Sequence, residues 1–197
     1  MRLFVALEIP SAVRENLAAL IEQLRAADAA SPKNKARWVR AENLHVTLKF
    51  IGHIDTGKLD AIRAALAEVR ADAPVELRFR GLGFFPNDRR PRVLWAGVEG
   101  SANLEGLAGE VDARLSKLEI PRETRQFAPH LTLARFDPPG ISEALRTAAL
   151  KNAEREFGSV RTGEFHLFES KTRPTGAEYT RLSSFSFVKG SFVKVEA

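Results

Sequence analysis

The sequence predicts an α+β protein in which two similar lobes of antiparallel sheet, with helices outside, face each other across a central cleft. Three observations support this fold class. Segments with strand alternation and segments with helical spacing follow one another along all 197 residues. The pattern His-x-Thr-Leu occurs once in each half of the chain. No low-complexity linker divides the sequence, so we expect residues 1–197 to form a single domain around one shared cleft.

The first half is predicted to begin with a strand and an amphipathic helix. Strand formers dominate the opening residues, and apolar residues then recur at helical spacing after Pro10 and Ser11. A polar, basic connection at 31–37 separates this unit from the next. The elements expected in order are a strand at 3–9, a helix from 11, a strand at 44–50, a helix at 59–69, and strands at 75–79 and 93–98 around a loop at 83–92.

The second half is predicted to repeat this plan. A helical pattern follows Ser101, a Pro- and Arg-rich stretch leads into a strand, and Gly158 is a candidate helix terminator. The elements expected in order are a helix at 101–118, a strand at 131–136, a helix at 142–157, and aromatic-rich strands at 160–168 and 178–188.

The composition excludes several kinds of chemistry. The chain has no cysteine, which rules out disulfides, zinc-thiolate sites and cysteine nucleophiles. The apolar stretch at the N-terminus is too short for a signal peptide, and no apolar run approaches membrane-spanning length. We therefore expect a soluble, cytoplasmic protein that does not contact membranes. A monomer is the expected state, although no feature of the sequence indicates the oligomeric state. The formal net charge of +5 slightly favours a polyanionic partner.

The two motifs carry the candidate chemistry. They are His45-Val46-Thr47-Leu48 and His130-Leu131-Thr132-Leu133, and they contain two of the four histidines. Successive side chains of a strand point to opposite faces, so each histidine shares a face with its threonine while the intervening apolar residues enter the core. Two such strands from related lobes would bring two imidazoles and two hydroxyls to one cleft.

This set of groups suits in-line displacement at phosphorus, in which protons move at both the attacking and the leaving oxygen. One imidazole must be neutral and the other charged, and histidine holds either state near neutral pH. Thr47 and Thr132 can donate hydrogen bonds to the non-bridging oxygens, and a nearby guanidinium such as that of Arg135 can balance the developing charge. The sequence has no known metal-binding signature and no glycine-rich phosphate loop, so we expect neither a metal nor a cofactor.

These features resemble the 2H phosphoesterase superfamily and, within it, the 2′-5′ RNA ligase-like cyclic phosphodiesterases. Besides the motifs, the similar segments are Arg2-Leu3-Phe4-Val5-Ala6-Leu7, Phe85-Pro86-Asn87 through Pro91-Arg92-Val93-Leu94-Trp95, and Gly176-Ala177-Glu178-Tyr179. The resemblance implies a bilobal fold and hydrolysis of terminal RNA 2′,3′-cyclic phosphates to 2′-phosphates, with tRNA fragments among the possible substrates. By the same analogy His45 is the general acid, His130 is the general base, and Arg135 binds phosphate. Strict alternation, however, puts Arg135 on the face opposite His130 unless the strand bends or ends there.

Three other functions remain open from the sequence. The same site run in reverse would join a cyclic phosphate end to a 5′-hydroxyl, giving a 2′-5′ linkage. A non-catalytic module would bind RNA ends without turning them over. A two-histidine metal site is disfavoured because the motifs carry no carboxylate partner.

The remaining candidate residues are expected to be structural. We expect surface or packing roles for His53 and His166, and a solvated position for Lys49 on the face of His45. For four aromatic residues, packing in the core is preferred over base stacking; they are Phe4, Phe84, Phe85 and Tyr179. The loop arginines are expected to be solvated; they are Arg89, Arg90 and Arg92.

Overall fold

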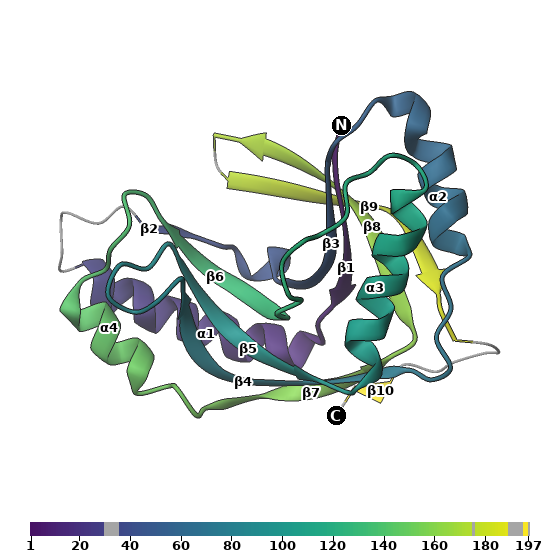
Figure 1. Cartoon of the computed structure of the whole chain (residues 1–197). Coiled ribbons are helices and arrows are strands. Elements are labelled where there is room, and N and C mark those ends of the chain that lie inside the picture. The colour runs from purple at the N-terminus through teal and green to yellow at the C-terminus, as the bar shows by residue number, and fades with distance from the viewer. Residues whose placement is uncertain (30–35, 175, 189–194, 197) are drawn as a thin grey trace.

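The computed structural model describes residues 1–29, 36–174, 176–188 and 195–196, which form two antiparallel sheets with helices packed against them (Figure 1). The four-stranded sheet has the order β3 (His45–His53), β1 (Arg2–Glu8), β8 (Glu164–Arg173), β9 (Gly176–Ser186). The six-stranded sheet has the order β10 (Val195–Glu196), β7 (Glu156–Thr162), β4 (Val75–Phe85), β5 (Val93–Gly100), β6 (His130–Phe136), β2 (Ala36–Trp38). The predicted α+β class is confirmed.

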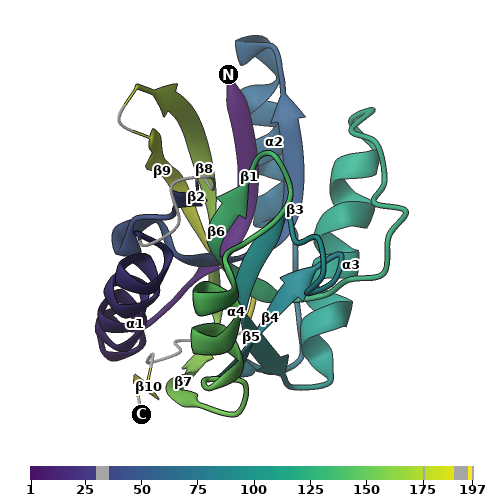
Figure 2. The same cartoon turned by 90° about the vertical axis from the view of Figure 1, so that its left-hand side faces the viewer.

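Two pairs of helices cover the sheets. They are α1 (Ser11–Ala29) with α4 (Glu143–Leu150), and α2 (Leu59–Ala67) with α3 (Asn103–Ser116), besides the short 3-10 turns η1 (Ala41–Asn43) and η2 (Thr56–Lys58). The first pair packs on β7 and β4 of the six-stranded sheet, and the second pair packs on β3 and β9 of the four-stranded sheet (Figures 1 and 2). Among the described residues, no helix is both long and apolar enough to cross a bilayer.

The chain passes from one sheet to the other more than once. Strands β1 and β3 belong to the four-stranded sheet, β4 to β7 to the six-stranded sheet, and β8 and β9 return to the first. Strand β2, which lies between β1 and β3 in sequence, pairs with β6. Neither sheet is therefore built from one half of the sequence alone, because local patterns define strands but not their partners.

Several boundaries differ from those predicted. Helix α4 ends at Leu150, and Phe157 and Gly158 belong to β7, where Phe157 is buried in the core. The spacing of apolar residues alone did not show that Phe157 belongs to a strand and not to the preceding helix. Strand β4 also extends to Phe85, into the predicted loop, and the aromatic segment near residue 164 is divided between β7 and β8. Of the predicted basic connection, residues 31–35 lie outside the described part.

The intervening apolar residues of both motifs enter the hydrophobic core, as alternation predicts. Val46, Leu131 and Leu133 are fully buried, and Leu48 is nearly so. Each motif strand is thus fixed by apolar packing on one face, which leaves the histidine and threonine on the other. This packing sets the direction in which the polar residues point.

Lys49 is not a solvated residue on the face of His45. Its side chain is 5% exposed and lies on the core side of β3, where Nζ donates to Oδ1 of Asp112 at 2.5 Å and to the carbonyl of Pro121 at 2.6 Å. Asp112 Oδ1 also accepts the backbone N–H of Glu123 at 3.1 Å. The buried pair therefore ties β3 to α3 and to the segment that leads into β6.

We predict that Lys49→Met destabilises the protein by about 3 kcal/mol, because removal of one partner leaves the other charge buried without compensation. Urea unfolding followed by tryptophan fluorescence, with the denaturant slope checked for constancy, measures the loss. The double variant Lys49→Met/Asp112→Leu should be more stable than Lys49→Met alone. A loss below roughly 1 kcal/mol for the single variant would show that this pair is no more important than an exposed one.

Candidate active site

A β-bulge at the same place in each motif strand shapes the site. In the pairing of β1 with β3, Ala6 is opposite Thr47 and Val5 is opposite Lys49, so Leu48 is the extra residue. In the pairing of β5 with β6, Trp95 is opposite Thr132 and Leu94 is opposite Ala134, which makes Leu133 the extra residue. An extra residue shifts the alternation by one position beyond the bulge.

The bulges change which residues accompany the histidines. Lys49 and Ala134 turn into the core, while Phe50 and Arg135, five residues after their histidines, are exposed on the histidine side of their strands. The prediction that Arg135 lies on the face opposite His130 is therefore wrong, because the bulge at Leu133 places both side chains on the same side of the strand. Phe50, which is 54% exposed, was missed because strict alternation places it on the wrong face.

Both catalytic candidates are held in the same way. His45 Nδ1 lies 2.7 Å from the carbonyl of Asn43, and His130 Nδ1 lies 2.8 Å from the carbonyl of Ala128, in each case two residues earlier. A carbonyl accepts only from N–H, so Nδ1 carries the proton in both neutral rings and Nε2 has the lone pair. Asn43 is itself fixed, because its Nδ2 donates to the carbonyl of Ala177 at 2.7 Å. Each ring can therefore accept or donate a proton at Nε2.

Aromatic residues from the other three strands of the four-stranded sheet surround His45. Its ring stacks on Phe4 with centroids 4.6 Å apart and meets the edge of Tyr179 at 5.3 Å. Phe168 stacks on Phe4 at 5.2 Å and lies 6.4 Å from the ring of His45. Phe4 is 3% exposed, so it supports the imidazole and has little surface to offer a nucleobase. Tyr179 is half-buried and keeps part of its ring accessible.

His130 has a smaller aromatic support. The ring of Phe85 meets it edge-on at 5.1 Å, and Trp95 lies 5.2 Å from Phe85. Gly83 makes this arrangement possible, because a Cβ at that position would lie 2.2 Å from the Trp95 ring. Phe85, expected to be a core residue, is thus partly buried beside the second histidine, whereas the loop arginines Arg89, Arg90 and Arg92 are exposed as predicted.

The structure brings the predicted site residues together from the two sheets. Strands β3 and β6 approach within 8 Å between Cα atoms. The positive charges of His130 and Arg135 both lower the pKa of His45. The charge of Arg135 also lowers the pKa of His130. Thr47 and Thr132 are half-buried on the histidine faces of their strands. His45, His130 and Arg135 therefore form one electrostatically connected cluster, and Thr47 and Thr132 lie on the same faces as the two histidines.

Burial is the main influence on the two imidazoles. It lowers the pKa of His45 to about 4, against the hydrogen bond to Asn43, with further lowering by His130 and Arg135. Burial likewise lowers the pKa of His130, against the hydrogen bond to Ala128, and Arg135 adds to the effect. Both rings are therefore neutral in the free protein at neutral pH. A bound anion would favour their protonated forms.

The other two histidines lie apart from this chemistry. His53 is exposed at the end of β3. His166 is 5% exposed, and its Nδ1 lies 2.9 Å from the hydroxyl of Ser184 while Nε2 lies 3.7 Å from Glu8. These positions agree with the surface and packing roles expected for them. No group of three or more His, Cys, Asp or Glu side chains within the described ranges is arranged to hold a metal ion.

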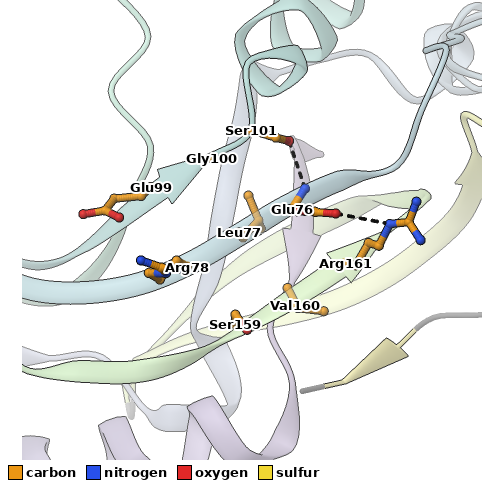
Figure 3. Close-up of a pocket in the computed structure, with 9 residues that line it drawn as sticks. All are labelled: Glu76, Leu77, Arg78, Glu99, Gly100, Ser101, Ser159, Val160 and Arg161. Carbon is orange, nitrogen blue, oxygen red and sulfur yellow. Dashed lines mark hydrogen bonds and ion pairs between the residues drawn. The ribbon is translucent and has the colours of Figure 1, made fainter.

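A hollow of about 510 Å³ lies on the six-stranded sheet where β4 begins and where β5 and β7 end (Figure 3). Glu76 and Arg161 form an ion pair of 3.5 Å in it, and the hydroxyl of Ser101 accepts the backbone N–H of Glu76. Its charged residues are of both signs, and none of the residues predicted from the motifs lines it. We therefore place the candidate chemistry at the histidines and not in this hollow.

Comparison with protein families gives one match that covers most of the chain. The model described as LigT like Phosphoesterase matches residues 7–95 and 98–179, so each matched stretch contains one histidine motif. Curated relatives named RNA 2′,3′-cyclic phosphodiesterase include proteins of Methanothermobacter thermautotrophicus (33% identical, covering 94% of this chain and 98% of the relative) and Archaeoglobus fulgidus (34% identical, covering 94% and 99%).

Solved structures give the same picture. A protein of Thermus thermophilus superposes with a TM-score of 0.72 at 33% identity, covering 95% of this chain and 98% of that one. Escherichia coli LigT complexed with 3′-AMP superposes with a TM-score of 0.74 at 26% identity, covering 94% and 97%. The similarity therefore extends over both sheets, not over one motif.

We predict that His45 in the free protein titrates near pH 4, and that Arg135→Gln raises the pKa of both His45 and His130 because it removes a nearby positive charge. NMR titration of the imidazole resonances, assigned with His45→Gln and His130→Gln, measures both effects. Because the folded pKa of His45 lies below its unfolded value of about 6.5, stability should fall as pH drops from 6.5 towards 4. Titration of both rings at 6.5 or above would contradict this account.

Proposed function

This chain belongs to the LigT-like phosphoesterase family, among the 2H phosphoesterases, and from that premise we propose that it hydrolyses RNA 2′,3′-cyclic phosphate ends to 2′-phosphates. The proposed catalyst is a single domain in which His45 and His130 exchange protons without a metal ion. The names of the curated relatives support the reaction, and the 3′-AMP complex of E. coli LigT supports a nucleotide as ligand.

The observation that carries the proposal is the matched setting of the two histidines. Each has Nδ1 bonded to the carbonyl two residues earlier, each precedes a threonine on the same face, and each strand has a bulge after that threonine. Two equivalent Nε2 atoms suit a reaction that needs one proton acceptor and one proton donor on opposite sides of a phosphorus atom. A packing role for either ring would not require this correspondence.

In the proposed reaction, His130 Nε2 takes a proton from water as the water oxygen attacks phosphorus. The bond from phosphorus to the 3′ oxygen breaks in line, and His45 Nε2–H donates a proton to that oxygen. The products are a 2′-phosphate and a free 3′-hydroxyl. Thr47 and Thr132 donate hydrogen bonds to the non-bridging oxygens, and Arg135 balances their charge.

The electrostatics of the free site bear on this division of roles. His45 must be protonated to act as an acid, yet burial lowers its pKa to about 4. The cyclic phosphate is a monoanion, and its binding beside the ring favours the imidazolium. Substrate and proton therefore bind together in this scheme, and the acid is formed in the complex.

The proposed partner is RNA with a terminal cyclic phosphate, including tRNA fragments, bound by a cytoplasmic monomer. The formal net charge of +5 favours a polyanion. Phe50 and Arg135 occupy equivalent, exposed positions after the two bulges and present flat surfaces beside the histidines. Such surfaces suit contacts with an unpaired base.

We predict that the protein converts an RNA oligomer ending in a 2′,3′-cyclic phosphate to the 2′-phosphate in the presence of EDTA. Alkaline phosphatase treatment distinguishes the opened monoester from the cyclic phosphate, and phosphorus NMR locates the monoester on the 2′ oxygen. Retention of labelled RNA with an intact cyclic end would instead indicate a binding module, and loss of turnover on chelation would indicate a metal enzyme. Adding an RNA with a 5′-hydroxyl and looking for joined product tests for 2′-5′ ligation in the same assay.

We predict that His45→Ala and His130→Ala each reduce kcat by at least about 10²-fold, whereas Thr47→Ala and Thr132→Ala cost less because each removes one hydrogen bond. The pH profile should be bell-shaped, and the alkaline limb of kcat should lie at higher pH than that of kcat/KM, because bound phosphate raises the pKa of the acid. Far-UV circular dichroism checks that the variants fold. Full activity of His130→Ala would rule out the two-histidine mechanism.

A further inference from the structure

A row of polar residues crosses the four-stranded sheet next to the aromatic cluster. In the pairing of β1 with β8, Leu3 is opposite Glu169 and Phe4 is opposite Phe168. Continuing this antiparallel register by one residue sets Arg2 beside Ser170, which in turn is opposite Tyr179 on β9. Arg2, Ser170 and Tyr179, called the polar row here, thus lie on neighbouring strands, one step along the sheet from the aromatic residues under His45.

The polar row lies on the same side of the sheet as the catalytic cluster. Arg2 and Phe4 are two positions apart on β1, so their side chains share a face. Phe4 stacks on His45, and Tyr179 contacts both rings, at 5.0 Å from Phe4 and 5.3 Å from His45. Tyr179 therefore connects the polar row to the first catalytic histidine.

Arg2 differs from the other cations of this sheet in having no ionic partner among the described residues. Arg173 pairs with Glu178 at 2.9 Å, Lys171 pairs with Glu169 at 3.2 Å, and Arg181 pairs with Glu8. The carboxylates nearest to Arg2 by register are therefore already engaged. The Arg2 side chain is exposed, and its guanidinium is free to bind an anion.

The charge of Arg2 also affects Tyr179, in agreement with the register. Burial raises the pKa of the Tyr179 hydroxyl, and the positive charges of Arg135 and Arg2 oppose that rise. Tyr179 thus lies within the field of two arginines, one from each sheet. Arg135 is the cation of the cluster at the histidines, so Arg2 extends the positive potential away from the reacting phosphorus along the first sheet.

We propose that Arg2, with the hydroxyls of Ser170 and Tyr179, binds the phosphodiester that links the terminal cyclic nucleotide to the preceding nucleotide. The inference rests on the proposed function, and it names the substrate class that the site prefers. A cyclic mononucleotide has no such phosphodiester, whereas every RNA end has one. The polar row would make the enzyme selective for RNA ends over small cyclic nucleotides.

Three substrates isolate the contribution of the charge on the internucleotide phosphate. The first is a ribonucleoside 2′,3′-cyclic phosphate, and the second is a dinucleotide ending in the same cyclic phosphate. The third is that dinucleotide with a neutral methylphosphonate in place of the internucleotide phosphate. The ratio of kcat/KM between the second and third substrates is measured within one protein preparation, so a partly folded variant does not alter it.

We expect the wild-type protein to prefer the anionic over the neutral linkage by roughly tenfold, as for one charge-assisted hydrogen-bonding contact, with the difference mainly in KM. Arg2→Gln should reduce this ratio towards one, and Arg2→Lys should restore part of it. The salt dependence of log kcat/KM for the dinucleotide should become shallower in Arg2→Gln, because one screened charge–charge contact is lost. Arg25→Gln, which removes an equal charge from α1, should leave the ratio unchanged.

Two results would overturn the inference while leaving the proposed function intact. One is a wild-type protein that does not distinguish the anionic from the neutral linkage. The other is an Arg2→Gln protein that keeps the full wild-type ratio. A wild-type protein that hydrolyses none of the three substrates would instead refute the proposed function, and the inference with it.

Discussion

The proposed chemistry depends on one spatial constraint, which is the close approach of β3 and β6. These strands belong to different sheets and carry the two histidines, so neither sheet contains a complete site. The buried Lys49–Asp112 pair lies at this junction, because it joins β3 to the segment that precedes β6. Removal of either partner would leave a buried charge without compensation, so the pair favours one arrangement of the segments that it joins. In the proposed mechanism, that arrangement sets the relative position of the two strands that act on one phosphorus atom.

The paired bulges show how a one-residue irregularity changes a site. Without the extra residue, Lys49 and Ala134 would accompany the histidines, and Phe50 and Arg135 would point into the core. A lysine in the core is tolerated only because Asp112 and the carbonyl of Pro121 satisfy it. The bulge in β3 and the ion pair are thus two parts of one arrangement, in which an aromatic residue is exposed and a charge is buried.

The sequence allowed the fold class, both motif strands and the joint placement of histidine and threonine to be predicted, because alternation over a few residues is a local property. It did not allow the bulges at Leu48 and Leu133 to be predicted, since an extra residue leaves no mark in an apolar run such as Leu133-Ala134. The tertiary neighbours of some elements were also missed. Strand β2 joins the six-stranded sheet, and helix α3 packs on the four-stranded sheet. Tyr179 and Arg2 therefore came together from opposite ends of the chain without a local signal.

The distribution of charge suggests why the site uses arginines as well as histidines. Burial makes both imidazoles neutral in the free protein, so at neutral pH the permanent positive charges of the proposed site are that of Arg135 near the histidines and that of Arg2 near Tyr179. A guanidinium keeps its charge throughout this range, whereas an imidazole gains its charge only when an anion arrives. The arginines can thus attract the phosphate before any proton is bound. The proton that the acid needs then follows from the binding of the substrate and not from the pKa of the empty site.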